Sequence, residues 1–398
     1  MKKSFTQGLV GSVGTQLNYA LSQWAVSIFI VKNLGSLGLG QFTYSLAILA
    51  PMLAFAGLGF RSLLSTEKNL DQAYKVLFTR FCLCAAGILL MFIWATQDPR
   101  VILPLFLFLG LFKLFDMLDD LLRGIYFFHD EFTKVFYWSL YFSLSNVVIC
   151  FIFIGIHKNL VAYAAAISIL KSSQVFGMYI QSRKRDFFLP TDLKISKSYI
   201  KMGVPLGIMA LLVALNSNIP KYLLTNYSST EDLGVFMGLF FFVTAGATLF
   251  VAAKNAAAPY LTRIHHKSPP ELYLKVIKLQ FFVLMFMLVA AVIAYQVADP
   301  FLLLIYTSEY HGLGLELAIL AVAGGFMYCQ SFSTLGLTIK RLLNPQPIIT
   351  SVSTVAGLVS ALYLIPKYGI LGASLSFLIS SFLIFTLSNI ILFKKRHA

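Results

Sequence analysis

Charged residues recur at helical spacing inside one apolar stretch of this 398-residue chain. The stretch 101–123 contains Lys113, Asp116, Asp120 and Arg123 at intervals of three or four residues. A helix would place these four side chains on one stripe, with Asp119 beside it. Two interpretations stay open. In the first, the pairs Lys113–Asp116 and Asp120–Arg123 neutralise each other. In the second, the stripe forms the wall of a water-filled cavity, in which a lysine binds an anionic substrate and a carboxylate binds a coupling proton or cation.

A single lysine stands in another apolar stretch, 160–180. Lys171 is followed there by Ser172, Ser173 and Gln174. The side chain of a lysine in the middle of a membrane span is too short to place its ammonium group easily in the water on either side. We therefore expect Lys171 to line a cavity rather than to face lipid.

Polar side chains mark two further stretches. In 9–31, Gln16 and Gln23 belong to a polar helical stripe, which fits either a cavity wall or hydrogen bonds between helices. In 202–225, two asparagines precede a lysine. We predict a substrate site drawn from these cavity candidates: Lys171, Lys113, Arg123, Gln16, Gln23, Asn216, Asn218 and Lys221. The candidates for ion coupling are Asp116 and Asp120.

Motifs of hydrolases, nucleotide-binding proteins and metalloproteins are missing from the sequence. The 6 histidines form no HExxH or other metal-ligand spacing, and there is no Walker lysine motif, no GxGxxG before a helix and no GxSxG. The cysteines, Cys82, Cys84, Cys150 and Cys329, lie in apolar stretches and imply neither a disulfide framework nor a metal site. We expect no catalytic residues, no ATPase activity, no metal and no cofactor.

The elements that must position these residues are membrane helices. Hydrophobic residues make up 58% of the chain and the mean hydropathy is +0.80. Charged residues make up 12%, against roughly 25% in soluble domains. Apolar stretches of about twenty residues match a helix that crosses the hydrocarbon layer. They predict an all-α polytopic membrane protein with about twelve spans, at 9–31, 39–60, 76–95, 101–123, 133–155, 160–180, 202–225, 232–253, 275–298, 313–337, 348–366 and 371–393.

The basic residues predict the orientation. With both termini inside, 24 of the 31 lysines and arginines fall in cytoplasmic segments or near the cytoplasmic ends of spans, and 5 in outer loops or near outer ends, while Lys113 and Lys171 lie deeper within spans. This excess favours an even number of spans with both termini in the cytoplasm. Basic loops beside an anionic leaflet also account for the net charge of +15 without a nucleic-acid partner.

The longest connection, the basic segment 181–201, divides the chain into two halves. We predict an N-terminal six-helix bundle over 1–180, a cytoplasmic linker over 181–201 and a C-terminal six-helix bundle over 202–398. A short repeat supports this division, because Leu39-Gly40-Gln41-Phe42 opens the second span and Leu233-Gly234-Val235-Phe236 opens the eighth. Two such bundles around a central cavity are typical of secondary transporters.

Several short motifs resemble one transporter family. They are Asn218-Ile219-Pro220-Lys221-Tyr222, Leu233-Gly234-Val235-Phe236, Ala258-Pro259-Tyr260-Leu261-Thr262-Arg263, Ile305-Tyr306-Thr307-Ser308-Glu309-Tyr310 and Gly369-Ile370-Leu371-Gly372-Ala373-Ser374. Together with the helix count, they resemble the Wzx-type O-antigen and polysaccharide flippases of the multidrug/oligosaccharidyl-lipid/polysaccharide exporter superfamily. The chain departs from the family pattern at Lys221, where arginine is commoner, and at Thr307-Ser308, which replaces a glycine turn.

The resemblance implies a flippase for an undecaprenyl-pyrophosphate-linked oligosaccharide in the bacterial inner membrane. It implies a cationic cavity but no fixed list of residues. The partners it implies are the lipid-linked substrate, membrane lipids, and the polysaccharide polymerase and chain-length machinery.

Two other functions stay open. A multidrug or cation antiporter of the related branch would favour acidic cavity groups. A membrane-embedded polysaccharide polymerase or ligase would need a larger outer loop than any in this sequence.

Overall fold

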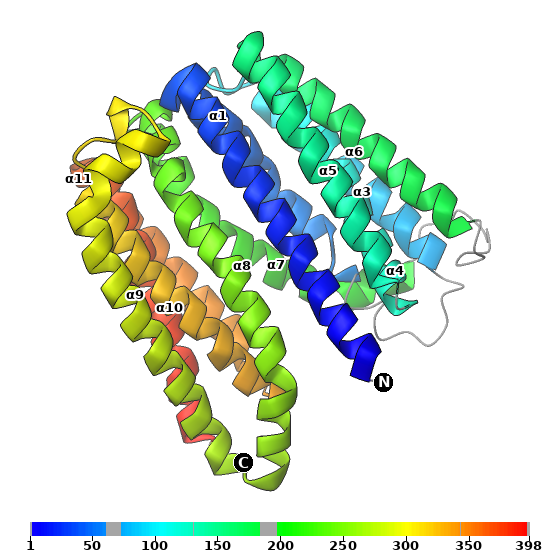
Figure 1. Ribbon diagram of the computed structural model, residues 1–398, viewed down its shortest axis with the longest axis vertical. Coiled ribbons are helices and arrows are strands. Elements are labelled where there is room, and N and C mark those ends of the chain that lie inside the picture. The colour runs from blue at the N-terminus through cyan, green and yellow to red at the C-terminus, as the bar shows by residue number, and fades with distance from the viewer. Residues whose placement is uncertain (1, 61–72, 130, 184–196, 343, 396–398) are drawn as a thin grey trace. The chain divides into compact units, whose positions relative to one another are not determined.

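The structure, a computed structural model, describes residues 2–60, 73–129, 131–183, 197–342 and 344–395. Within these ranges the ordered elements are all helices (Figure 1). They are α1 (Lys2–Ala56), α3 (Ala73–Ala95), α4 (Leu103–Phe128), α5 (Phe132–Cys150), η2 (Phe151–Ile156), α6 (Leu160–Arg183), α7 (Lys197–Tyr227), α8 (Thr230–Lys267), α9 (Pro269–Ile305), η3 (Ser308–Tyr310), α10 (Gly314–Ile339) and α11 (Pro345–Lys394).

The helices account for the twelve predicted spans. In the described part of the chain, 9 helices are long and apolar enough to cross a membrane. Two of them, α1 and α11, are double, because the backbone leaves the helical conformation at Gly35 and Gly369. Both glycines have a positive φ, which other residues rarely adopt. The twelfth span is α4, which is long enough to cross a membrane but carries more charged residues for its length than the nine helices counted above. The prediction of an all-α polytopic membrane protein is confirmed.

The chain forms two compact units. The first comprises Met1–Leu34 and Gln41–Ala214, and the second comprises Gly35–Gly40 and Leu215–Ala398. The division lies within α7, whose first part packs on the first unit: a Cβ added at Gly203 would lie 2.7 Å from the Leu58 carbonyl oxygen. Most of the predicted linker, 184–196, lies outside the described residues, and the predicted domain limits stay a prediction.

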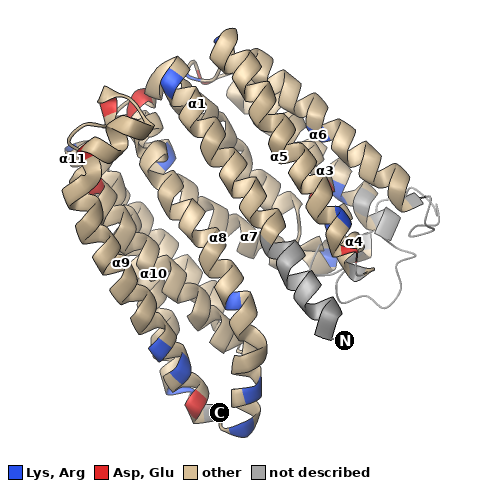
Figure 2. Ribbon diagram, viewed as in Figure 1, with Lys and Arg blue, Asp and Glu red and all other residues tan. Residues whose placement is uncertain are grey.

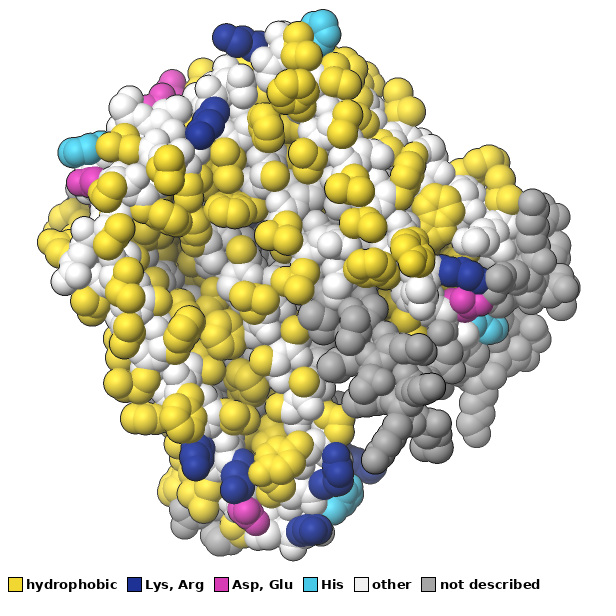
Figure 3. Space-filling model, viewed as in Figure 1, with side chains coloured by type: hydrophobic (Ala, Val, Ile, Leu, Met, Phe, Trp, Pro, Cys, Tyr) yellow, Lys and Arg dark blue, Asp and Glu magenta, His cyan; other side chains and the backbone are white. Residues whose placement is uncertain are grey.

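Each unit has its own apolar core. In the first unit, buried side chains from α4 and α6 gather around Leu121, Tyr126 and Met178. In the second, α10 packs against α8, α9 and α11, around Leu261, Phe332 and Leu392. Figure 2 shows lysines and arginines near the lower ends of α8 and α9, and Figure 3 shows apolar side chains over much of one face. Exposed apolar side chains along the helices are what lipid contact requires.

The two copies of the short repeat touch each other in the second unit. A Cβ added at Gly40 would lie 1.9 Å from the Thr230 carbonyl oxygen, and one added at Gly234 would lie 1.9 Å from the Ser36 carbonyl oxygen. Only glycine allows two helix backbones to approach so closely. The repeat therefore marks a helix crossing as well as two equivalent positions in the chain.

Candidate functional site

Helix α4 brings the charged residues of the first unit together. It packs against α3, α5 and α6, so its charged stripe meets neighbouring helices as well as solvent. Lys113 and Asp116 form the predicted pair, with 3.0 Å between Lys113 Nζ and Asp116 Oδ2. This pair fits the three-residue spacing, which places both side chains on one helix face.

The second pair expected on α4, Asp120–Arg123, is wrong. Arg123 instead donates to Asp119 through two nitrogens, with Nε 3.0 Å from Oδ1 and Nη2 2.7 Å from Oδ2. The planar guanidinium fits a carboxylate best in this two-bond geometry, and the four-residue spacing allows it. Asp120 is paired across helices with Arg80 of α3, at 3.3 Å.

Lys171 of α6 also contacts the carboxylates of α4 and so belongs to the same network of ion pairs. Its side chain is 0% exposed, and its ammonium contacts Asp119 and lies 3.2 Å from Asp116 Oδ1. The ammonium also lies 4.5 Å from the centre of the Phe142 ring. A buried charge is tolerated only when it is paired and hydrogen-bonded, and here two carboxylates meet that need. Lys171 therefore lies behind the wall of the pocket that is described next. The sequence instead predicted that it lines a cavity.

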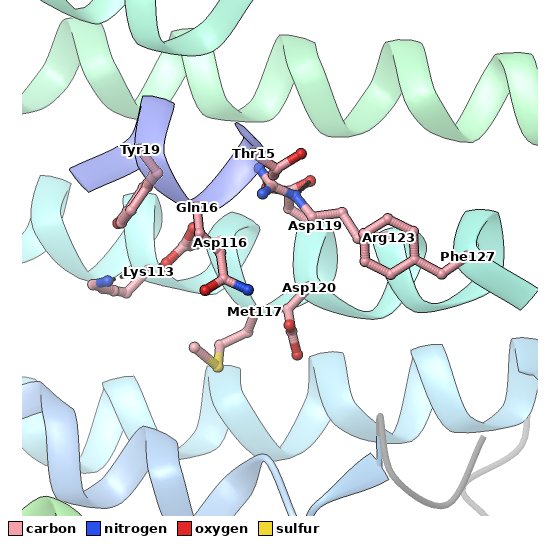
Figure 4. Close-up of a pocket in the computed structure, with 10 residues that line it drawn as sticks. All are labelled: Thr15, Gln16, Tyr19, Lys113, Asp116, Met117, Asp119, Asp120, Arg123 and Phe127. Carbon is pink, nitrogen blue, oxygen red and sulfur yellow. Dashed lines mark hydrogen bonds and ion pairs between the residues drawn. The ribbon is translucent and has the colours of Figure 1, made fainter. Parts of the chain in front are cut away.

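A pocket of about 360 Å³ opens beside the network. Lys113, Asp116 and Arg123 lie on its wall and are 25%, 18% and 15% exposed. Helix α1 contributes the facing polar groups. Figure 4 shows the ten lining residues, which are Thr15, Gln16, Tyr19, Lys113, Asp116, Met117, Asp119, Asp120, Arg123 and Phe127. The pocket thus offers two cations, three carboxylates and several neutral hydrogen-bonding groups to a ligand.

The structure brings together five of the ten predicted site residues. Those on the pocket wall are Gln16, Lys113, Asp116, Asp120 and Arg123. Gln23 lies further along α1 and is not among the lining residues.

The remaining three predicted residues belong to α7 in the second unit. Asn216 accepts a hydrogen bond from Ser380 at 2.8 Å, and Lys221 donates to Asn218 at 2.9 Å. Their roles in binding stay a prediction.

Two residues of the network were missed from the sequence. Asp119 was noted only as a neighbour of the stripe, although its four-residue spacing to Arg123 was a usable signal. Arg80, one of the 24 basic residues assigned to the cytoplasmic side, lies in α3 and is 5% exposed. Among the described residues, no group of three His, Cys, Asp or Glu side chains is arranged to hold a metal ion.

Helix α1 is fixed beside the pocket by hydrogen bonds to α5. Ser139 donates to the Thr15 carbonyl oxygen at 3.2 Å, and Asn146 donates to Ser22 Oγ at 3.0 Å. Tyr163 of α6 in turn donates to Asn146 at 2.9 Å. The polar side of α1 therefore serves two purposes: Ser22 holds helices together, as the simpler interpretation of the stripe expected, and Gln16 faces the pocket.

Comparison with known proteins agrees with the resemblance found in the sequence. A family model described as polysaccharide biosynthesis protein matches residues 11–265. The capsular polysaccharide biosynthesis protein CapF of Staphylococcus aureus is 24% identical over 391 residues, and the match covers 96% of each chain.

Solved structures show the same fold. An outward-facing multidrug resistance transporter of the MATE family, in the MOP superfamily, matches with a TM-score of 0.72 at 15% identity, over 99% of this chain and 96% of that one. The lipid II flippase MurJ, in an inward closed conformation, matches with a TM-score of 0.75 at 14% identity, over 97% and 87%. At these identities the likeness concerns the fold alone.

Proposed function

Because the chain belongs to the polysaccharide biosynthesis protein family, we propose that it moves a polyprenyl-pyrophosphate-linked oligosaccharide across the membrane by alternating access. The observation that supports this most directly is the pocket of the first unit, where Lys113 and Arg123 lie on a wall beside neutral polar groups of α1. A pyrophosphate bearing sugars is prohibitively costly to move through hydrocarbon, whereas its polyprenyl tail is stable there. The protein must therefore shelter the head group and leave the tail in lipid.

The residues in and behind the pocket wall have different roles in binding. Lys113 and Arg123 bind the phosphate oxygens, since charge-assisted hydrogen bonds are strong where little water competes. Gln16 and Tyr19 donate to phosphate or sugar oxygens. Lys171 acts from behind the wall by holding Asp116 and Asp119 in place.

Transport runs from the cytoplasmic to the outer leaflet of the plasma membrane, with both termini in the cytoplasm. The halves of the chain rock about a central cavity that opens first to one side and then to the other. Asn216, Asn218 and Lys221 bind the substrate from the C-terminal half, and Gln23 extends the polar face of α1. The direction comes from an ion gradient, the membrane potential or removal of the product. If an ion is coupled, Asp116 and Asp120 bind it. The product passes to the polymerase and chain-length machinery.

A multidrug or cation antiporter is the second candidate, because MATE transporters share the fold and three carboxylates line the pocket. The charge of the network favours an anion over a cation. Among the described residues, Arg80, Lys113, Arg123 and Lys171 pair with Asp116, Asp119 and Asp120, which leaves one positive charge.

The proposal is tested by replacing the cations at the pocket wall. In a strain that lacks the chromosomal copy, Lys113→Ala or Arg123→Ala should abolish surface glycan while the protein stays in the membrane at normal abundance. Lys113→Arg should retain part of the activity, since the charge remains but its geometry changes. The matched control is Lys158→Gln, an exposed loop lysine. Normal glycan export by both alanine variants would refute the anion site.

A double variant separates binding from charge balance. Lys113→Ala leaves Asp116 with fewer partners, so a loss of export could come from the stranded carboxylate. If Lys113→Ala/Asp116→Ala exports normally, Lys113 serves only as a counter-ion. If the double variant stays inactive at normal abundance while Asp116→Ala alone still exports, Lys113 contacts the substrate.

A further inference from the structure

Asp116 lies between two cations and also faces the pocket. Its Oδ2 is 3.0 Å from Lys113 Nζ, and its Oδ1 is 3.2 Å from Lys171 Nζ. The side chain is on the pocket wall (Figure 4). A carboxylate in this place makes the contacts that a phosphate oxygen of a ligand would make.

Asp119, its neighbour on α4, is held in a different way. Its side chain is 2% exposed, and it accepts both bonds from Arg123 as well as the contact from Lys171. Removing Asp119 from this position would take the carboxylate from Arg123 and one of two carboxylates from the buried Lys171, which is costly. Asp116 is the more exposed carboxylate and shares Lys171 with Asp119, so it can leave Lys113 at much lower cost.

A phosphate that binds Lys113 would share its ammonium with the Asp116 carboxylate. Two like charges on one ammonium repel each other strongly where water is scarce. The phosphate therefore binds fully only if the Asp116 carboxylate turns away from Lys113. While it turns, Lys171 keeps Asp116 paired, and Asp119 keeps Arg123 in position at the wall.

We propose that Asp116 is an exchangeable counter-ion, which occupies the anion site when it is empty and is displaced from Lys113 by the substrate phosphate. This rests on the proposed function and assigns Asp116 a role in setting affinity. A transporter must bind its substrate well enough to capture it and weakly enough to release it. The carboxylate returns to Lys113 as the phosphate leaves, and so favours release.

The proposal predicts that removing the carboxylate tightens binding and slows export. The probe is inorganic pyrophosphate, titrated calorimetrically into the full-length protein in lipid nanodiscs. Asp116→Asn should lower the Kd by about tenfold, as expected for one relieved like-charge contact, and should lower the rate of glycan export in cells. Asp116→Glu keeps the charge and should bind with a Kd within about threefold of the wild type.

The matched control is Glu131→Gln. Glu131 pairs with Lys134 at 2.8 Å with the same three-residue spacing, in the same unit but away from the pocket lining. Its replacement removes the same net charge and should leave the Kd unchanged. If Asp116→Asn does not fold, as judged by size exclusion and thermal unfolding, Asp116→Ser replaces it.

The results of these titrations distinguish a failure of the proposed function from a failure of the counter-ion role. If the wild type binds no pyrophosphate, the anion site of the proposed function is wrong, and the counter-ion role fails with it. If the wild type binds but Asp116→Asn binds equally or less tightly, the counter-ion role alone is overturned. It is also overturned if Glu131→Gln tightens binding as much as Asp116→Asn does, because the effect would then come from net charge.

Discussion

Glu309 accepts a hydrogen bond from the Ser36 backbone amide, with 3.0 Å between Glu309 Oε2 and Ser36 N. Ser36 is the first residue after the break at Gly35, so the carboxylate caps the helix that restarts there. The same loop carries Tyr306 and Tyr310, whose hydroxyls donate to the carbonyl oxygens of Gly238 and Gly234. One short loop thus fastens the start of two helices in the second unit.

Replacing Glu309 should loosen the helix that begins at Ser36. We expect Glu309→Ala to destabilise this helix start by about 0.5–2 kcal/mol, the usual cost of removing an N-terminal cap. Hydrogen exchange at residues 36–40 should then be faster by about 2- to 30-fold. The control is Asp299→Asn. Asp299 lies in α9 and accepts a hydrogen bond from the backbone amide of Gly312, in the same loop as Glu309, at 2.8 Å. Unchanged exchange at 36–40 in Glu309→Ala would show that the cap contributes nothing.

Alanine at either glycine of the helix crossing should disrupt the second unit. Within a helix, Gly→Ala normally stabilises by about 1 kcal/mol. At Gly40 and Gly234 the new Cβ would lie 1.9 Å from a backbone carbonyl oxygen, and overpacking of this kind costs about 1–3 kcal/mol or more. We therefore expect a lower thermal unfolding temperature for Gly40→Ala and Gly234→Ala. Gly155→Ala, with its nearest neighbour at 3.5 Å, should unfold at a temperature no lower than that of the wild type.

Hydropathy was enough to predict most of the fold. A membrane span must satisfy its backbone hydrogen bonds internally, so apolar stretches of sufficient length become helices whatever surrounds them. The breaks at Gly35 and Gly369 fall in the gaps predicted between spans. The short repeat was visible in the sequence, but nothing local indicated that Gly40 and Gly234 lie at one crossing.

The pairing within the site was harder to predict. Helical spacing placed the charges of α4 on one side, but Asp120 could pair along its helix or across to α3. The outcome depended on Arg80 and Lys171, which come from other helices. Partners on different helices are set by packing, which the spacing of residues in one helix cannot reveal.

The orientation predicted from basic residues can be tested with reporter fusions. Fusions after Lys32 and after Lys158 should report an outer location, and a fusion at Ala398 should report a cytoplasmic one. The physical reason is that basic loops resist translocation across the membrane. An outer signal at Ala398, or a cytoplasmic signal at Lys158, would contradict the twelve-span topology with both ends inside.

Asp98, in the connection between α3 and α4, should make stability depend on acid pH. Burial opposes its ionisation, but hydrogen bonds from Arg100 and Tyr44 outweigh this and lower the pKa of Asp98 to about 2 from an ordinary value of 3.8. Because the folded pKa is the lower one, the stabilisation is complete above about pH 4 and is lost as the pH falls toward 2. The unfolding temperature of the wild type should approach that of Asp98→Asn over this range. A constant difference between them would refute the assignment.

The buried pair formed by Lys171 and Asp119 predicts an unequal response to single replacements. Lys171→Met removes one cation and leaves Lys113 with Asp116 and Arg123 with Asp119, so every remaining charge on the pocket side keeps a partner. Asp119→Asn instead leaves Arg123 and the fully buried Lys171 with one carboxylate fewer. An uncompensated buried charge costs about 3–5 kcal/mol, whereas replacing a buried charge by a well-packed apolar group can be close to neutral. We therefore expect Asp119→Asn to lower the unfolding temperature in detergent much more than Lys171→Met. The opposite order would mean that Lys171 carries most of the stabilisation. Equal losses would mean that Asp119 is not the centre of the network.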